Sequence, residues 1–181
     1  DDPSRYVQRS IANNLNDISK DHPQLIIELC QRWLIDETDN RKWIIRHGCR
    51  SLIKLGNPAV FSLLGFTDEV KISIEQFKVE KSQINVGESL GFSFEIKSTS
   101  DAEQLLMIDY KIHHVKGSQK RTNKVFKLKT IKLEANKMIE INKKHSFKVI
   151  NTRKYYSGLH TIELIVNGKS IGDMDFNLQD P

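Results

Sequence analysis

The sequence predicts an α+β protein of two domains. HEAT-like α-solenoid repeats over residues 1–68 precede an immunoglobulin-like antiparallel β-sandwich over residues 69–181. Segment 6–17 returns in altered form as segment 43–54, and each copy precedes a proline and a second apolar helix. Recurring helix pairs of this kind are typical of helical repeat arrays. From about residue 70 the hydrophobic pattern changes from helical to alternating, and short strand patterns separated by turn residues follow, as in an immunoglobulin-like sandwich.

Four helices are predicted in the first half. Asp2-Pro3 suits the start of the first helix, which should end near Lys20 because residues before a proline disfavour helix. The other helices are predicted over 23–35, over 41–55 and over 58–65. The apolar positions expected to be buried in these helices are Val7, Ile11, Leu15, Ile18, Leu25, Ile26, Leu29, Trp33, Ile45 and Leu52.

Seven strands are predicted in the second half. Asn167-Gly168 between two strand patterns is a strong hairpin signal. Gly87–Gly91 holds a serine between glycines but lacks the strand–turn–helix context of a nucleophile, so we interpret it as a turn that enters a strand. The predicted strands cover residues 71–75, 90–96, 105–115, 124–133, 138–149, 160–166 and 170–178.

Composition describes an ordinary soluble protein, with 38% hydrophobic and 28% charged residues. No apolar run approaches the roughly 18 residues of a membrane span, so no membrane partner is expected. Cys30 and Cys49 lie in helical patterns, which favours buried thiols in a reduced, cytoplasmic protein. Residues 1–68 carry nine basic and nine acidic side chains, whereas residues 69–181 carry nineteen and fourteen. This asymmetry points to a polyanionic partner for the second half.

Polar side chains recur at helical spacing on the first and third helices, opposite the apolar stripe. Guanidinium groups at such spacing suit phosphates, and a nearby aromatic offers a wall for stacking. A solvated helix face with intrahelical pairing is an equally open interpretation. We expect four of the cations, at positions 9, 46, 50 and 54, to share one exposed concave face. The candidate binding residues are Tyr6, Arg9, Asn13, Asn16, Lys20, Trp43, Arg46, His47, Arg50 and Lys54.

The second half contains a basic tract, residues 111–132, without a single acidic side chain. Its segment Lys116–Arg121 resembles a hairpin tip, and cations on a protruding loop can enter a nucleic-acid groove. Protection of an edge strand by lysine explains the tract equally well. His113 and His114 alternate across a strand, and no histidine has a companion at ligand spacing, so no metal is expected. The candidate binding residues here are Lys116, Lys120 and Arg121.

Several segments resemble the AlkC branch of the AlkC/AlkD DNA-alkylation-repair proteins, which are HEAT-like repeat DNA glycosylases. The resemblance rests on RSIANNLNDISKDHP (9–23) and RKWIIRHGCRSLIKLGNP (41–58), with weaker blocks VGESL (86–90), IDY (108–110), KVFKL (124–128) and YSGLH (156–160). It implies base excision repair of cationic N-alkylated bases such as 3-methyladenine. The partner it implies is double-stranded DNA carrying such bases, bound by a monomer that needs no cofactor.

Such an activity needs a carboxylate beside the sugar, because positive charge develops there as the base leaves. The resemblance implies that this carboxylate lies in a segment upstream of residue 1, so we expect this chain to bind DNA without excising bases at a useful rate. Within the chain, Asp17 is the one weak catalytic candidate, and a structural role within its repeat is the alternative. The rival function is a protein–protein interaction module without catalysis.

Overall fold

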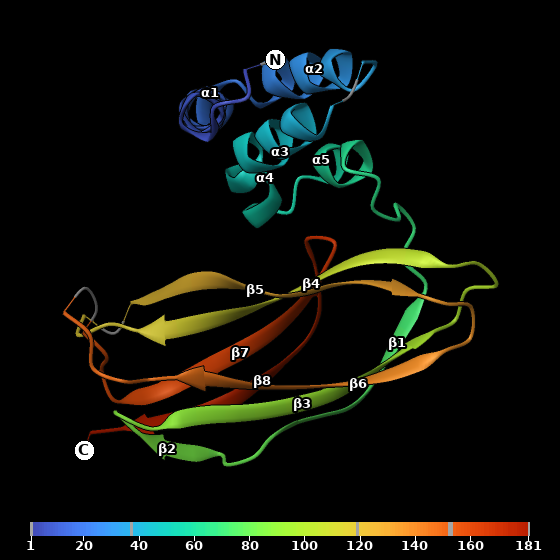
Figure 1. Ribbon diagram of the computed structural model, residues 1–181. Coiled ribbons are helices and arrows are strands. Elements are labelled where there is room, and N and C mark those ends of the chain that lie inside the picture. The colour runs from blue at the N-terminus through green and yellow to red at the C-terminus, as the bar shows by residue number, and fades with distance from the viewer. Residues whose placement is uncertain (1, 37, 119, 152–153, 181) are drawn as a thin grey trace. The chain divides into compact units, whose positions relative to one another are not determined.

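The computed structural model describes residues 2–36, 38–118, 120–151 and 154–180. Contacts between Cα atoms divide the chain into two compact units, residues 1–68 and 69–181. The first unit is built from helices and the second from strands (Figure 1). The prediction of an α+β protein is therefore confirmed, while the assignment of the helices to HEAT-like repeats stays a prediction.

The helical unit packs its helices around one apolar core. Ile26 of the second helix, Ile45 of the third and Leu52 of the fourth are buried in it, and so are both cysteines, which are free thiols. The unit is made of α1 (Arg5–Asp21), α2 (Pro23–Trp33), α3 (Asp39–Gly48), α4 (Arg50–Lys54) and α5 (Pro58–Leu63).

Two helix boundaries differ from the sequence prediction. The N-cap of α1 is Ser4, since the Asp2 carboxylate accepts a hydrogen bond from the Ser4 N–H at 2.7 Å instead of capping the helix itself. The helix predicted over 41–55 is interrupted at Cys49. At Gly48, just before the interruption, a Cβ atom would lie only 3.1 Å from the Leu15 Cβ. The missing side chain therefore lets α3 approach α1 closely.

The buried face of α1 is turned from the predicted stripe. Val7, Ile11 and Ile18 were expected to be buried but are only half-buried, although Leu15 is buried as expected. On α2, Leu25 was likewise expected in the core but is exposed. The face of α1 that packs against α3 and α4 carries small and polar side chains besides Leu15. The buried side chains of α1 are Gln8, Ala12, Leu15, Asn16 and Ser19.

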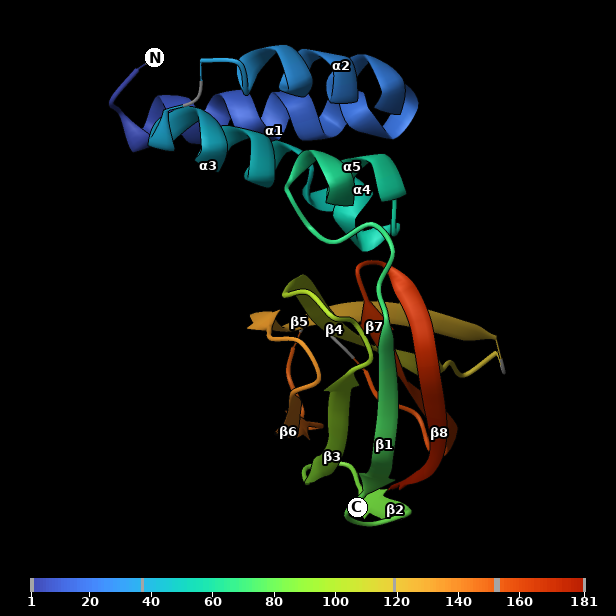
Figure 2. The same ribbon diagram turned by 90° about the vertical axis from the view of Figure 1, so that its right-hand side faces the viewer.

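The β unit is a sandwich of two sheets whose inner faces form one core (Figure 2). The strand order is β1-β3-β6 in one sheet and β2-β8-β7-β4-β5 in the other. All pairs are antiparallel except β2 with β8. The strands are β1 (Ile72–Val79), β2 (Gln83–Asn85), β3 (Ser89–Ser98), β4 (Gln104–Val115), β5 (Arg121–Leu133), β6 (Met138–Ser146), β7 (Gly158–Val166) and β8 (Lys169–Gln179).

The turns of the β unit follow the sequence signals. Asn167 and Gly168 connect β7 to β8 with φ values of 44° and 79°, as a tight hairpin of the predicted kind requires. Ser89 begins β3, as expected for a turn that enters a strand. The short strand β2 escaped prediction, because three residues with one buried side chain form no alternating pattern.

Candidate nucleic-acid interface

A stack of one cation and two rings joins α1 to α3. The guanidinium carbon of Arg5 lies 4.3 Å from the centroid of the Trp43 ring, which is a cation–π contact. The His47 ring stacks on the same indole with centroids 4.7 Å apart and planes 13° from parallel. The Trp43 indole, predicted as a stacking surface for a ligand, is therefore already in contact with Arg5 and His47. Arg5 was missed in the sequence, although it lies one helical turn before Arg9 on α1.

Arg50 connects α1 to the α3–α4 junction. Its Nη1 donates to the His47 carbonyl oxygen at 2.8 Å and to the Ala12 carbonyl oxygen at 3.5 Å. Its Nη2 donates to the Asn13 Oδ1 at 3.1 Å. Arg50 and Asn13, two of the candidate binding residues, are thus brought together, but part of the guanidinium is used for helix packing.

Asn16 does not belong to the exposed surface. Its side chain is 3% exposed, and its Oδ1 accepts a hydrogen bond from the Ser51 N–H at 3.1 Å. This bond satisfies one of the first backbone donors of α4, which no residue within that helix can do. The prediction that Asn16 lines a binding surface was wrong, because the residue caps a buried helix end instead.

The surroundings of His47 change the pKa of its imidazole. Burial, followed by the positive charges of Arg50 and Arg9, lowers the pKa of the imidazole below its ordinary value. The imidazole is thus favoured in its neutral form, first by burial and then by the two nearby positive charges. Arg5 and His47 thus lie on the Trp43 ring, and the charges of Arg9 and Arg50 reach the His47 imidazole. We call these five residues the α1–α3 cluster.

Asp17 lies near this cluster but is paired. Its carboxylate accepts a hydrogen bond from the Lys20 Nζ at 2.8 Å, and the Asp17 side chain is 68% exposed. The hydrogen bond and charge of Lys20, with a smaller effect from Arg50, lower the pKa of Asp17. An exposed, ionised carboxylate tied to a lysine fits the structural interpretation of Asp17 better than a catalytic one.

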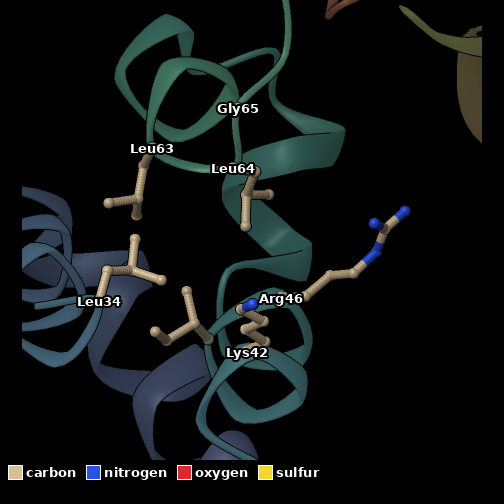
Figure 3. A pocket seen from close by; sticks show the side chains of 7 residues that line it. Leu34, Lys42, Arg46, Leu63, Leu64 and Gly65 are labelled. Atoms are coloured by element: carbon tan, nitrogen blue, oxygen red, sulfur yellow. The ribbon is translucent and has the colours of Figure 1, made fainter. Parts of the chain in front are cut away.

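Arg46 lines a separate cavity of about 340 Å³ in the helical unit. The side chains of Leu34, Leu63 and Leu64 point into one space, whereas the guanidinium of Arg46 extends away from them (Figure 3). Of the four cations expected to share a face, Arg46 is exposed at this cavity, Arg9 and Lys54 are exposed, and Arg50 is half-buried. Tyr6, also predicted at this surface, is 82% exposed.

The hairpin of the basic tract is closed by the Lys116 N–H, which donates to the Lys120 carbonyl oxygen at 2.9 Å. Gly117 packs under Tyr156, since a Cβ at this glycine would lie 2.8 Å from a carbon of that ring. The Lys154 Nζ lies 5.2 Å from the centroid of the same ring. Tyr156 therefore brings a third lysine, Lys154, to the hairpin. The sequence does not show this neighbour, because Lys154 lies more than 30 positions from Lys120 along the chain.

Arg121 is not at the tip, contrary to prediction. It begins β5, and its guanidinium donates to the Thr161 Oγ1 at 3.2 Å and to the Leu159 carbonyl oxygen at 3.3 Å. Both acceptors lie in β7, so the side chain is held along the sheet. Two N–H donors of Arg121 are therefore used in strand packing, although the residue is exposed.

Lys111 of the basic tract is also used within the β unit. The Glu163 carboxylate accepts from the His113 Nε2 at 2.6 Å and lies 3.1 Å from the Lys111 Nζ. Although burial opposes it, hydrogen bonding from these two partners lowers the pKa of Glu163. Lys132 likewise pairs with Glu103 at 3.5 Å. Two lysines of the basic tract are thus paired with carboxylates from other segments, which offset their charge.

His114 lies inside the sandwich while His113 lies on the sheet surface, so the predicted alternation is confirmed. Within residues 2–36, 38–118, 120–151 and 154–180, no three His, Cys, Asp or Glu side chains are arranged to hold a metal ion. None of the described helices is long and apolar enough to cross a membrane.

Comparison with known proteins identifies the class. The family described as "Uncharacterised protein YhaZ, C-terminal Ig-like domain" matches residues 73–180, which makes the β unit an immunoglobulin-like domain. The fold is also found, at a TM-score of 0.53 and 13% identity over 60% of this chain and 15% of the other, in a β-glucosidase from Erythrobacter marinus. That likeness concerns the fold alone.

Two relatives match almost the whole chain. "Uncharacterized protein YhaZ" of Bacillus subtilis (strain 168) is 38% identical over 177 residues, which are 98% of this chain and 49% of the relative. The Pseudomonas fluorescens alkylpurine DNA glycosylase AlkC, solved bound to DNA containing an abasic site analog, superposes with a TM-score of 0.93 at 39% identity. This match covers 98% of this chain and 49% of the other. The chain thus spans about half the length of these relatives.

The chain belongs to the YhaZ family, and the resemblance to the AlkC branch that its sequence predicts is confirmed.

Proposed function

We propose that this chain is the DNA-binding part of a DNA glycosylase that removes alkylated bases in base excision repair. The observation that carries the proposal is the likeness, over 98% of the chain, to an alkylpurine DNA glycosylase solved on DNA. The α1–α3 cluster supports it, because Arg5 and His47 lie on one indole and the positive charges of Arg9 and Arg50 act on the same imidazole. Such groups suit the phosphates of a duplex.

The substrates we propose are cationic bases such as 3-methyladenine, excised from duplex DNA by a monomer. A positively charged base is already a good leaving group, so the protein needs no strong general acid. It needs a carboxylate that stabilises the positive charge developing on the sugar. Asp17 is a poor candidate for this role, since it is exposed and bonded to Lys20. We place the catalytic carboxylate in the half of the relatives' length that this chain does not cover, within a continued array of HEAT-like repeats.

Two measurements on the chain test the proposal. Binding of an unmodified duplex should show a dissociation constant on the order of 10⁻⁴–10⁻⁶ M at physiological salt and should weaken steeply as salt rises, because counterions are released from phosphates. Incubation with N-methylated duplex should release little base from this chain and much more from a version extended by the family's upstream residues. Binding that does not respond to salt would favour the protein–protein interaction module, and equal excision by both versions would return Asp17 to the active site.

A further inference from the structure

We propose that Cys30 and Cys49 form an intramolecular disulfide bond when the protein meets a hydroperoxide, and that this bond ties α2 to the junction between α3 and α4. The helical unit thus contains a redox-dependent cross-link. The inference goes beyond the proposed function and does not depend on it, because it concerns the stability of the unit and not its ligand.

The two thiols come from different helices and meet in the core of the helical unit. The Cys30 Sγ lies 3.9 Å from the Cys49 Sγ, and one of the two thiols donates a hydrogen bond to the other sulfur. Both residues have no exposed surface, and both are free thiols. They are also the only two cysteines in the sequence. A disulfide within one chain can therefore join only this pair.

The backbone at Cys49 favours closure of the bond. A disulfide holds its sulfurs about 2.05 Å apart, so the two sulfurs must approach one another by roughly 2 Å. Cys49 lies where α3 ends and α4 begins, and its φ and ψ angles of −86° and 6° depart from regular helix geometry. Rotation of the two side chains, together with a small shift at this interruption, brings the sulfurs within bonding distance.

The oxidant is a small hydroperoxide, because both sulfurs are buried and are reached only when the unit opens locally. One sulfur attacks a peroxide oxygen, so that an S–O bond forms, the O–O bond breaks and a water molecule leaves. The second sulfur then attacks this sulfenic acid, so that the S–S bond forms, the S–O bond breaks and a second water leaves. The two thiols lose two electrons and two protons in total, and the peroxide is reduced to water.

The bond adds a connection that helix packing supplies only weakly. The main contacts of α2 are with α1 and α5, whereas the disulfide attaches it to the α3–α4 junction. Cys30 and Cys49 lie 19 positions apart along the chain. A cross-link over a segment of this length restricts the unfolded chain, so the thermal midpoint of the helical unit should rise by on the order of 10 °C.

The test treats the reduced chain with hydrogen peroxide and then returns part of the sample to dithiothreitol. The monomer should lose the mass of two hydrogen atoms at its cysteines, and digestion should release one peptide pair that carries both. The thermal midpoint of the helical circular-dichroism signal should rise after peroxide and fall back after dithiothreitol. Methionine sulfoxide is not reversed by dithiothreitol, so the difference between the two samples reports on the disulfide alone.

Cys30→Ala and Cys49→Ala are the matched controls, since each keeps one thiol and cannot form the bond. Peroxide should raise the midpoint of neither variant. If a variant fails to fold, the comparison of peroxide-treated and re-reduced unsubstituted chain still decides the question. Thiols that stay reduced, cysteines that gain oxygen instead of pairing, disulfides found only between two chains, or a bond that leaves the midpoint unchanged or lower would each overturn the inference.

Discussion

The two units of the chain use their cations differently. In the helical unit, Arg5 lies on the Trp43 indole, and burial together with the charges of Arg50 and Arg9 lowers the pKa of the His47 imidazole stacked on that indole. In the β unit, strand partners take up much of the basic tract, as the bonds of Arg121 to β7 and of Lys111 to Glu163 show. A run of cations in a sequence therefore indicates positive charge, but the fold decides how much of that charge faces a ligand.

The largest expected effect is a loss of stability confined to the β unit, which would show that the two units unfold independently. Phe147 is fully buried at the centre of the aromatic cluster of the β unit, in contact with the rings of His145, Tyr155 and Phe176. Phe147→Ala should lower the free energy of unfolding of the β unit by about 3–5 kcal/mol, because a cavity replaces the ring. Hydrogen exchange should locate the loss in β3 to β8 and leave the amides of α1 to α3 protected. Equal loss of protection in both units would show that they unfold together.

The next effect concerns pH. His160 has no exposed surface, its Nε2 is bonded to the Tyr156 carbonyl oxygen at 3.0 Å, and burial lowers its pKa. The folded β unit thus binds fewer protons than the unfolded chain, in which the pKa is about 6.5. Stability should be constant above that value and fall as the pH decreases towards the lowered pKa.

Urea unfolding at pH 7.5 and pH 5.5 measures this difference. The variant His160→Phe keeps an aromatic ring in the stack with Phe176 and removes the titrating group, so its two midpoints should lie closer together. If the variant loses as much stability on acidification as the unsubstituted chain, other groups are responsible.

The hairpin of the basic tract gives a smaller, graded effect. If all three candidate residues of the hairpin, Lys116, Lys120 and Arg121, met phosphates, replacing them would lower the salt slope by about 3 units, at roughly 0.9 per contact. Because Arg121 is bonded to β7, Lys116→Ala with Lys120→Ala should remove at most about 2 units, and Arg121→Ala should remove little. A full unit lost in Arg121→Ala would show that its guanidinium leaves the sheet to meet DNA.

The smallest effect is expected at Asp17. Because its exposed carboxylate is tied to Lys20, Asp17→Asn in a chain extended by the upstream residues should excise N-methylated bases at nearly the original rate. A loss of a hundredfold or more in the rate of base release would make Asp17 catalytic.

How much the sequence predicts differs between the two units for physical reasons. Alternating strands and the Asn167-Gly168 turn are local patterns, so most strands were predicted correctly. In the helical unit, the helical period located the helices but not the side of α1 that is buried, because Gly48 and Ala12 permit a close contact that hydrophobicity does not mark. Asn16 looked like a surface residue since its partner, the Ser51 N–H, lies 35 positions away.

The candidate site was predicted only in part. Arg9, His47 and Arg50 were recognised by their spacing, which places them on helix surfaces whatever the packing. Arg5 was missed because its significance comes from its contact with Trp43 across two helices. Such contacts between distant segments cannot be read from periodicity alone.

The central claim is that the arginines of the α1–α3 cluster contact DNA phosphates. The most direct test is the slope of the logarithm of the duplex-binding constant against the logarithm of the salt concentration, compared between the unsubstituted chain and two variants. Arg9→Ala with Arg50→Ala should reduce the slope by about 2 units, at roughly 0.9 for each lost phosphate contact. Arg32→Ala, which removes an exposed arginine of α2 outside the cluster, should leave the slope unchanged. An undiminished slope in the double variant, or an equal reduction in Arg32→Ala, would contradict the claim.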